Sequence, residues 1–197
     1  FDLHYHALGD FIAKLDLSDI TLVVQDWGGL LGLAYAARQP ERIARLVILN
    51  TFLPTGEEEK SPAFLRWRRF AENVPDLPIG RVIRQGLAES SSLSDAEEAA
   101  YEAPFPTPES KAGAVAWPLL VPMTPEDPVA DVMRETRDRL ADWKKPAFVL
   151  FAPDDPILGE AHTFFRELIP TAVNHPEVTI DDASHFLQEE QGPTIAQ

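Results

Sequence analysis

The chain has 197 residues, and its hydrophobic fraction of 45% is enough for one sizeable domain with an insertion, which argues against a disordered segment. A net charge of −15 disfavours nucleic acid and anionic membrane surfaces as partners, because both repel an acidic protein. No cysteine is present, so disulfides, thiolate nucleophiles and cysteine-ligated metals are excluded, and no apolar run approaches the roughly 20 residues of a membrane span.

Helical and strand patterns alternate over the first fifty residues. Apolar residues at helical spacing predict a helix over 6–17, and a run rich in β-branched residues predicts a buried strand over 21–25. A second helix is predicted over 30–37 and a second buried strand over 45–50. This alternation is typical of a parallel sheet with helices on both faces.

The middle of the chain has a different character. Proline and charged residues become frequent, no strand pattern is convincing, and short helices are predicted over 62–74, 95–101 and 109–119. We interpret residues 53–122 as a mostly helical insertion into a core made of residues 1–52 and 123–197. In the second part of that core, helices are predicted over 129–143 and 160–168, and strands over 147–151 and 177–180.

The most informative local motif is VVQDWGG, between the first predicted strand and the next helix. A nucleophile elbow places one side chain on a strained turn between a strand and a helix, and it needs small residues nearby. Gly28 and Gly29 meet this need, although Val24 stands where the general pattern prefers glycine. The residue at the tip is Asp26. The alternative interpretation is an ordinary aspartate that caps the helix.

Two later residues favour the catalytic interpretation. Asp155 follows the third predicted strand, and His185 follows the fourth. A single histidine, or a loop such as PDDP, is more often structural. The order nucleophile, acid, histidine, with each residue after a strand, is nevertheless that of the α/β-hydrolase fold, so Asp26, Asp155 and His185 are predicted to form a catalytic set.

On these motifs the sequence resembles the haloalkane dehalogenase family. The matching stretches are VVQDWGG, IARLVILNTFLP, AYEAPFP, DPILG and SHFLQE. The resemblance implies an α/β-hydrolase fold with a helical cap at residues 53–122 and with the early strands missing from this chain. An alternative position for the acid in the family holds Asn50 and Thr51 here, which leaves Asp155 as the acid and Asp154 as the second choice.

The resemblance also implies a reaction, the hydrolytic dehalogenation of small haloalkanes. Asp26 would attack the halogen-bearing carbon to give an alkyl ester and a halide ion. His185, oriented by Asp155, would then activate the water that hydrolyses the ester. The halide needs donors such as an indole N–H, for which the resemblance implies Trp27 and Trp67, with Trp117 as the alternative.

The partners implied are a small halogenated hydrocarbon, a halide ion and water, with no cofactor. The five histidines are too scattered to suggest a metal site. The first residue is Phe1 and not methionine, so we expect an amino-terminally truncated chain that lacks part of its oxyanion hole. The lack of cysteine and of a membrane segment leads us to expect a cytoplasmic location. The oligomeric state stays open.

Three other functions remain as alternatives. Epoxide hydrolases share an aspartate nucleophile but commonly use two cap tyrosines, and the predicted cap contains only Tyr101. Dehalogenases of the fluoroacetate type usually have arginine at the position of Trp27. A non-catalytic ligand-binding fragment is the alternative from another class, and the intact set of Asp26, Asp155 and His185 disfavours it for the whole protein.

Overall fold

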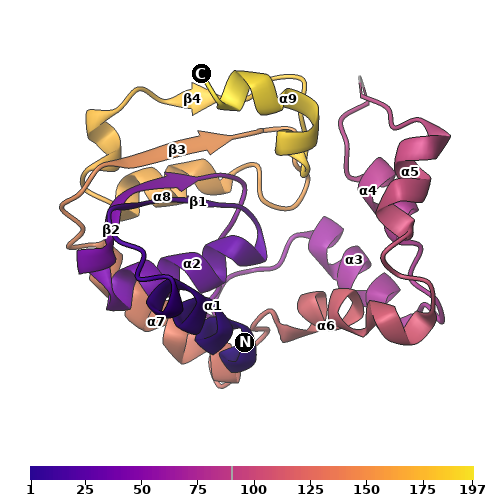
Figure 1. The fold of residues 1–197 in the computed structure, drawn as a ribbon, viewed down its shortest axis with the longest axis horizontal. Helices are drawn as coiled ribbons and strands as arrows, with labels where there is room; N and C mark the ends of the chain where they lie inside the picture. The colour runs from indigo at the N-terminus through magenta and orange to yellow at the C-terminus, as the bar shows by residue number, and fades with distance from the viewer. Residues whose placement is uncertain (90) are drawn as a thin grey trace. The chain divides into compact units, whose positions relative to one another are not determined.

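The computed structural model describes residues 1–89 and 91–197, which form two compact units. The sheet unit contains residues 1–58, 122–151 and 160–179, and the helical unit contains residues 59–121, 152–159 and 180–197. Figure 1 labels the helices and strands of both units. All the strands that the described residues form belong to the sheet unit.

Four parallel strands form the sheet, and they lie side by side in the order in which they occur in the chain. They are β1 (Ile20–Val24), β2 (Ile43–Ile48), β3 (Ala147–Phe151) and β4 (Val178–Thr179). The last residue of β1, Val24, is aligned with Ile48 of β2. The predicted parallel sheet is therefore confirmed, and the residues that follow β1 and β2 meet at the same edge.

Helices cover the sheet. Helix α2 (Trp27–Arg38) contacts α1 (Asp2–Lys14), α7 (Pro128–Leu140) and β1, while α8 (Ala161–Leu168) contacts β3 (Figure 1). Two short 3₁₀ turns, η1 (Pro40–Arg42) and η3 (Ala172–Asn174), complete the sheet unit. Large apolar side chains from all these layers are fully buried, including Leu33, Ile48, Met133, Phe151 and Phe165. This core fixes the end of β1, which Asp26 follows.

A charged cluster supports the loop after β2. The guanidinium of Arg137 lies over the rings of Phe52 and Phe164, and its Nη2 lies 2.5 Å from Oε1 of Glu58. The amide and hydroxyl of Thr55 also donate to the Glu58 carboxylate. Burial would raise the pKa of Glu58, but the hydrogen bonds from Thr55 and the charge of Arg137 outweigh it and lower the pKa to about 2.

The helical unit is built from two helix pairs and one later helix. Helix α3 (Pro62–Asn73) packs on α6 (Ala112–Leu120), and α4 (Ile79–Gln85) packs on α5 (Asp95–Glu102). The 3₁₀ turn η2 (Pro108–Lys111) leads into α6, and α9 (Leu187–Ile195) comes from the end of the chain. Ser61 and Ser94 cap α3 and α5 with their hydroxyls, which explains why these helices begin where they do.

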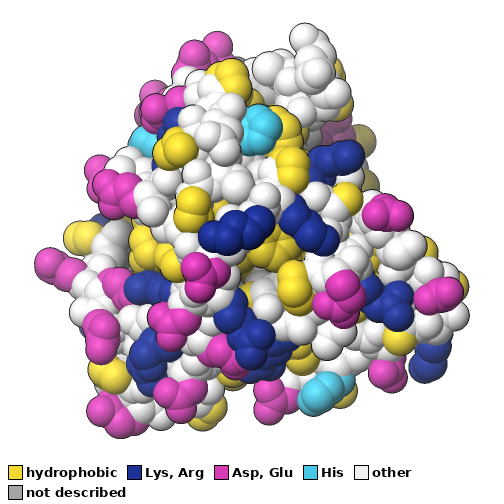
Figure 2. Space-filling view, turned by 90° about the vertical axis from the view of Figure 1, so that its left-hand side faces the viewer, with side chains coloured by type: hydrophobic (Ala, Val, Ile, Leu, Met, Phe, Trp, Pro, Cys, Tyr) yellow, Lys and Arg dark blue, Asp and Glu magenta, His cyan; other side chains and the backbone are white. Residues whose placement is uncertain are grey.

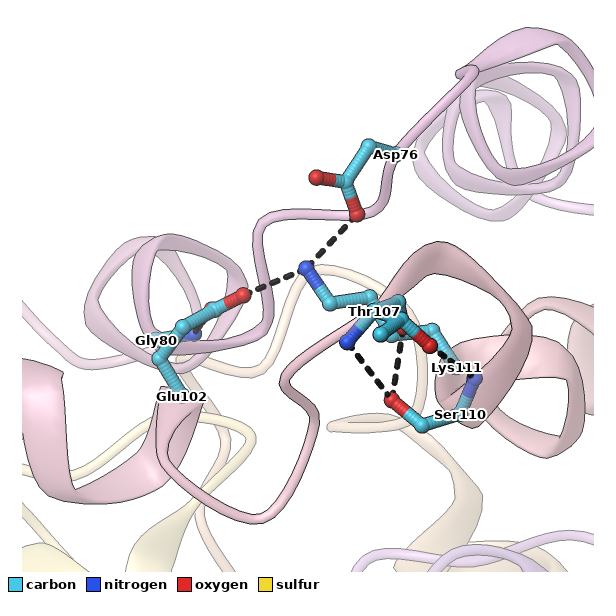
Figure 3. A network of polar contacts seen from close by, with 6 residues as sticks. All are labelled: Asp76, Gly80, Glu102, Thr107, Ser110 and Lys111. Atoms are coloured by element: carbon cyan, nitrogen blue, oxygen red, sulfur yellow. Dashed lines mark hydrogen bonds and ion pairs between the residues drawn. The ribbon is translucent and has the colours of Figure 1, made fainter.

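A buried lysine joins these segments (Figure 3). The ammonium group of Lys111 donates to Asp76 at 2.7 Å and to Glu102 at 2.5 Å, and Glu102 also accepts the backbone N–H of Gly80. The Lys111 side chain is only 4% exposed. Buried charges are stable only when paired, so this network is structural.

Most predicted elements are confirmed, with ends shifted by a few residues. The helix predicted over 109–119 divides into η2 and α6, and only two residues of the strand predicted over 177–180 pair in the sheet. Helices α4 and α9 lie outside the predicted elements. The division into a core and a cap at 53–122 stays a prediction, and the helical unit also takes in 152–159 and 180–197.

The surface is mixed in charge. On the face drawn in Figure 2, acidic side chains lie among lysines and arginines and do not gather into a single patch. Within the described part of the chain, no helix is both long enough and apolar enough to cross a membrane.

Candidate active site

Asp26 occupies a strained turn between β1 and α2. Its backbone angles are φ 47° and ψ −128°, and it is the residue immediately before α2. An ordinary helix cap has extended backbone, whereas these angles match a turn position that glycine prefers. The Asp26 carboxylate accepts the backbone N–H of Trp27, the first residue of α2, at 2.7 Å. The aspartate therefore caps the helix from a conformation that a cap does not need.

Residues at the end of β2 hold this conformation. The Asp26 N–H donates to the carbonyl of Asn50 at 2.8 Å, and the hydroxyl of Thr51 donates to the carbonyl of Asp26 at 2.7 Å. Both Asn50 and Thr51 are fully buried. Backbone strain persists when its surroundings over-determine it, and these two bonds do so here. Thr51 is a supporting residue that the sequence motif does not identify.

Glycines on α2 leave room for neighbouring side chains. A Cβ on Gly29 would overlap the side chain of Thr51, and a Cβ on Gly32 would lie 2.7 Å from Val24. Gly28 differs, because a Cβ there would meet nothing within 4 Å. The prediction that the elbow needs small residues is thus confirmed for Gly29. The same need exists at Gly32, whereas the space at position 28 does not require a glycine.

Asp155 and His185 form a direct pair within the helical unit. Nδ1 of His185 lies 2.9 Å from Oδ2 of Asp155, while Oδ1 of Asp155 accepts the backbone N–H groups of Ile157 and Leu158. The Asp155 side chain has no exposed area, and that of His185 is 20% exposed. Such a carboxylate can fix the tautomer and orientation of the His185 imidazole.

The side chain of the neighbouring Asp154 is exposed, and this residue makes a different contact. Its backbone carbonyl accepts the hydroxyl of buried Ser184 at 3.4 Å, which links the loop of the acid to the loop of the histidine. The structure brings Asp155, and not Asp154, to His185. Asp26 and Trp27 belong to the sheet unit, whereas Asp155 and His185 belong to the helical unit.

Three tryptophans were candidates for halide donors. Trp27 is the first residue of α2 and is partly buried against the sheet-unit core. Trp67 lies on α3, half-buried, with its ring centroid 6.1 Å from that of Phe70. Trp117 lies on α6, the helix that packs on α3. Halide binding by Trp27 and Trp67 stays a prediction, with Trp117 as the alternative.

A groove of about 720 Å³ in the helical unit contains none of the predicted site residues. Its charged lining consists of Asp76, Arg81, Asp95, Glu98, Glu102 and Lys111. Most of these charges are already paired within the protein. Lys111 contacts Asp76 and Glu102, and Arg84 contacts Asp95 and Glu98. In the part of the chain that the structure describes, no group of His, Asp and Glu side chains is placed to hold a metal ion.

Comparisons with known proteins identify the family and the fold of the chain. A family model described as alpha/beta hydrolase fold matches residues 1–191. A haloalkane dehalogenase of Mycolicibacterium paratuberculosis is 43% identical over 197 residues, covering 100% of this chain and 64% of that protein. One from Psychrobacter cryohalolentis is 38% identical over 196 residues, with the same coverage.

A solved structure is also similar. The tetrameric haloalkane dehalogenase from Paraglaciecola agarilytica aligns with a TM-score of 0.87 and 28% identity, covering 98% of this chain and 63% of that chain. The resemblance found in the sequence motifs is therefore confirmed over the whole chain. The chain spans 64% of the length of the two curated relatives described above.

Proposed function

The chain belongs to the α/β-hydrolase family, and we propose that the protein hydrolyses small haloalkanes to an alcohol and a halide ion through a covalent ester on Asp26. The observation that carries the proposal is the carboxylate at the tip of the elbow, held at φ 47°. Serine esterases present a hydroxyl at this position, so an aspartate points to displacement at carbon. The similarity to haloalkane dehalogenases supports carbon–halogen bonds as the target.

In the first step, one oxygen of Asp26 attacks the halogen-bearing carbon. The new carbon–oxygen bond forms as the carbon–halogen bond breaks, and the halogen leaves with the bonding electrons as a halide ion. Because the backbone N–H of Trp27 donates to Oδ1 of Asp26, we assign Oδ2 as the attacking oxygen and Oδ1 as the future ester carbonyl oxygen. Indole N–H groups of Trp27 and Trp67 would stabilise the departing halide, with Trp117 as the alternative to Trp67.

In the second step, water attacks the carbonyl carbon of the ester. His185 accepts the water proton at Nε2, and Asp155, which contacts Nδ1, stabilises the imidazolium. The tetrahedral intermediate carries its negative charge on Oδ1 of Asp26. The backbone nitrogen of Trp27 already lies 2.7 Å from this oxygen, so its N–H can stabilise the charge. Collapse of this intermediate breaks the bond to the alkyl oxygen, which takes the proton from the His185 imidazolium and leaves as the alcohol. The Asp26 carboxyl group then loses its proton to solvent, which restores the carboxylate.

The helices within residues 53–122 would act as the cap that shapes an apolar pocket and shields the ester from bulk water. The substrates in this proposal are a small halogenated hydrocarbon and water. We place the reaction in the cytoplasm, in keeping with a chain that contains no cysteine.

Epoxide hydrolysis is disfavoured by Tyr101. An epoxide hydrolase needs a phenol that can give its proton to the epoxide oxygen. The hydroxyl of Tyr101 instead donates to Glu189 at 2.6 Å, and this hydrogen bond, together with burial, raises the pKa of Tyr101 to about 12. The one tyrosine within 53–122 is thus a weak acid that is already engaged.

The test is bromide release from 1-bromobutane and 1,2-dibromoethane by the wild type, Asp26→Ala and His185→Ala. The proposal expects turnover by the wild type, no bromide from Asp26→Ala, and a trapped alkyl-enzyme mass with His185→Ala. Turnover of styrene oxide without bromide release would replace the proposal with the epoxide reaction.

A further inference from the structure

We propose that Glu190 is a positioning residue for His185. Its carboxylate joins the histidine loop, residues 181–186, to the segment that follows α4. The inference rests on the proposed function, because it assigns His185 as the base of the hydrolytic step. All the groups involved belong to the helical unit.

The two oxygens of Glu190 hold two different segments. Oε2 accepts the backbone N–H of Ser184 at 2.7 Å, and Oε1 accepts the backbone N–H of Ala88 at 2.8 Å. Ser184 is buried and directly precedes His185 in the chain. Charge-assisted bonds of this length are about twice as strong as neutral ones, so Glu190 fixes the backbone from which the His185 side chain projects.

The segment after α4 also contacts the histidine itself. The His185 N–H donates to the carbonyl of Gly86 at 3.1 Å. A Cβ on Gly86 would lie 2.5 Å from the ring of Phe186, so this segment packs tightly on the residue after the histidine. Residues 86–88 therefore contact the histidine loop directly at Gly86 and through Glu190 at Ala88.

The chemistry of the site requires two acceptors on one side chain. Two backbone N–H groups point at Glu190, and a carboxylate can accept from both of them. A glutamine has one acceptor oxygen and one NH₂ group, so it would leave one N–H facing another donor. The expected result of Glu190→Gln is a histidine loop that loses one of its two attachments while the side chain keeps its volume.

Glu189 provides a matched control on the same helical turn. It is exposed, and its contact is the Tyr101 hydroxyl, which a glutamine oxygen can also accept. Glu189→Gln removes the same charge, one residue away, without touching the N–H of Ser184 or Ala88. A difference between the two variants therefore reports the hydrogen bonds and not the charge.

The experiment separates the two chemical steps in the full protein. Rapid quenching with 1-bromobutane gives the rate of bromide release in the first turnover, and mass spectrometry gives the decay of the alkyl-enzyme. In Glu190→Gln we expect the first bromide release to stay within about 3-fold of wild type, while ester hydrolysis slows by about 10–100-fold, because misplacing a catalytic group by about 1 Å costs up to that much. Glu189→Gln should match the wild type in both steps.

Glu190→Asp keeps the charge and both acceptor oxygens on a shorter stem, so it should recover part of the hydrolysis rate. Ester hydrolysis by Glu190→Gln within 2-fold of wild type would overturn the positioning role. An equal loss in both steps in both Glu190 variants would also overturn it, because that pattern indicates general loss of structure. Wild-type protein that forms no ester at all would overturn the proposed function, and the role of Glu190 with it.

Discussion

Replacing Asp26 by glycine is expected to stabilise the protein, whereas replacing it by alanine is expected to destabilise it. At φ 47° and ψ −128° the backbone is in a region where a Cβ is unfavourable, and glycine has none. Alanine keeps the Cβ and so keeps the strain. Both variants lose the carboxylate that accepts the Trp27 N–H. The comparison isolates the cost of holding a side chain at the elbow.

The magnitudes follow from the separate contributions. Backbone strain of this kind costs about 1–3 kcal/mol, which glycine relieves. Glycine gives back about 0.4–1 kcal/mol through the greater freedom of its unfolded state, and a few tenths for the lost cap. The expected net gain is about 1 kcal/mol. Alanine relieves nothing and loses the cap, a cost of about 1 kcal/mol. The two variants should therefore differ by about 2 kcal/mol in their free energy of unfolding.

Urea unfolding of the wild type and both variants measures this difference directly. Thermal unfolding gives a second estimate, because about 1 kcal/mol corresponds to about 2–4 °C in Tm for a chain of this size. Both variants should also fail to release bromide. Equal stabilities for the glycine and alanine variants would refute the reasoning, since the turn would then carry no strain that a Cβ imposes.

Three further predictions concern single substitutions elsewhere in the protein. Gly29→Ala should destabilise the protein by about 1–3 kcal/mol, because its Cβ would overlap the side chain of Thr51. Gly28→Ala should be neutral or stabilising, because its Cβ meets nothing within 4 Å, and equal urea midpoints for the two variants would contradict this. The folded-state pKa of Glu58 is about 2, below its ordinary 4.5, so Glu58 should contribute about 3 kcal/mol of stability above pH 4.5 that is lost as the pH falls toward 2. In Glu58→Gln the urea midpoint should vary less with pH between 4.5 and 2 than in the wild type. A variant whose midpoint falls as steeply as that of the wild type would count against the contacts described for Glu58. Asp155→Asn should lower kcat for bromide release by about 10²–10⁴-fold, while Asp154→Asn should stay within about 2-fold; the reverse order would move the acid to Asp154.

The sequence predicts the strands that have a clear local pattern, and it misses short or irregular elements. The runs at β1, β2 and β3 are short and largely apolar, and each forms a strand. Helix α4 has only seven residues, and it contains a glycine. Helix α9 contains a proline and is kinked at Gln191, so neither helix shows a clear helical period. Strand β4 contributes two residues, too few for alternation to define its ends.

The residues of the candidate site could be predicted from the sequence, but the contacts that support them could not. Asp26, Asp155 and His185 could be selected because each follows an apolar run, and their order is a property of the sequence. The contacts that support them could not be predicted. Thr51 is an unremarkable residue after a strand, and Glu190 contacts Ala88 across 102 positions of the chain. Such contacts depend on the packing of distant segments, which a single sequence does not encode in any local pattern.

The order of the strands also has a consequence for how the chain folds. Only α2 and the turn η1 separate β1 from β2, so the parallel pairing of these strands closes only a short crossover. β2 and β3 are neighbours in the sheet, yet the whole segment between Ile48 and Ala147 separates them, and only three residue pairs set their register.

Contacts between distant segments form slowly, because the entropy of closing the loop is lost before the contacts are gained. Folding of the intervening helices shortens that loop. We therefore expect the joining of β2 to β3 to be the late step in assembly, and destabilisation of helices α3 to α6 to slow the folding of the sheet.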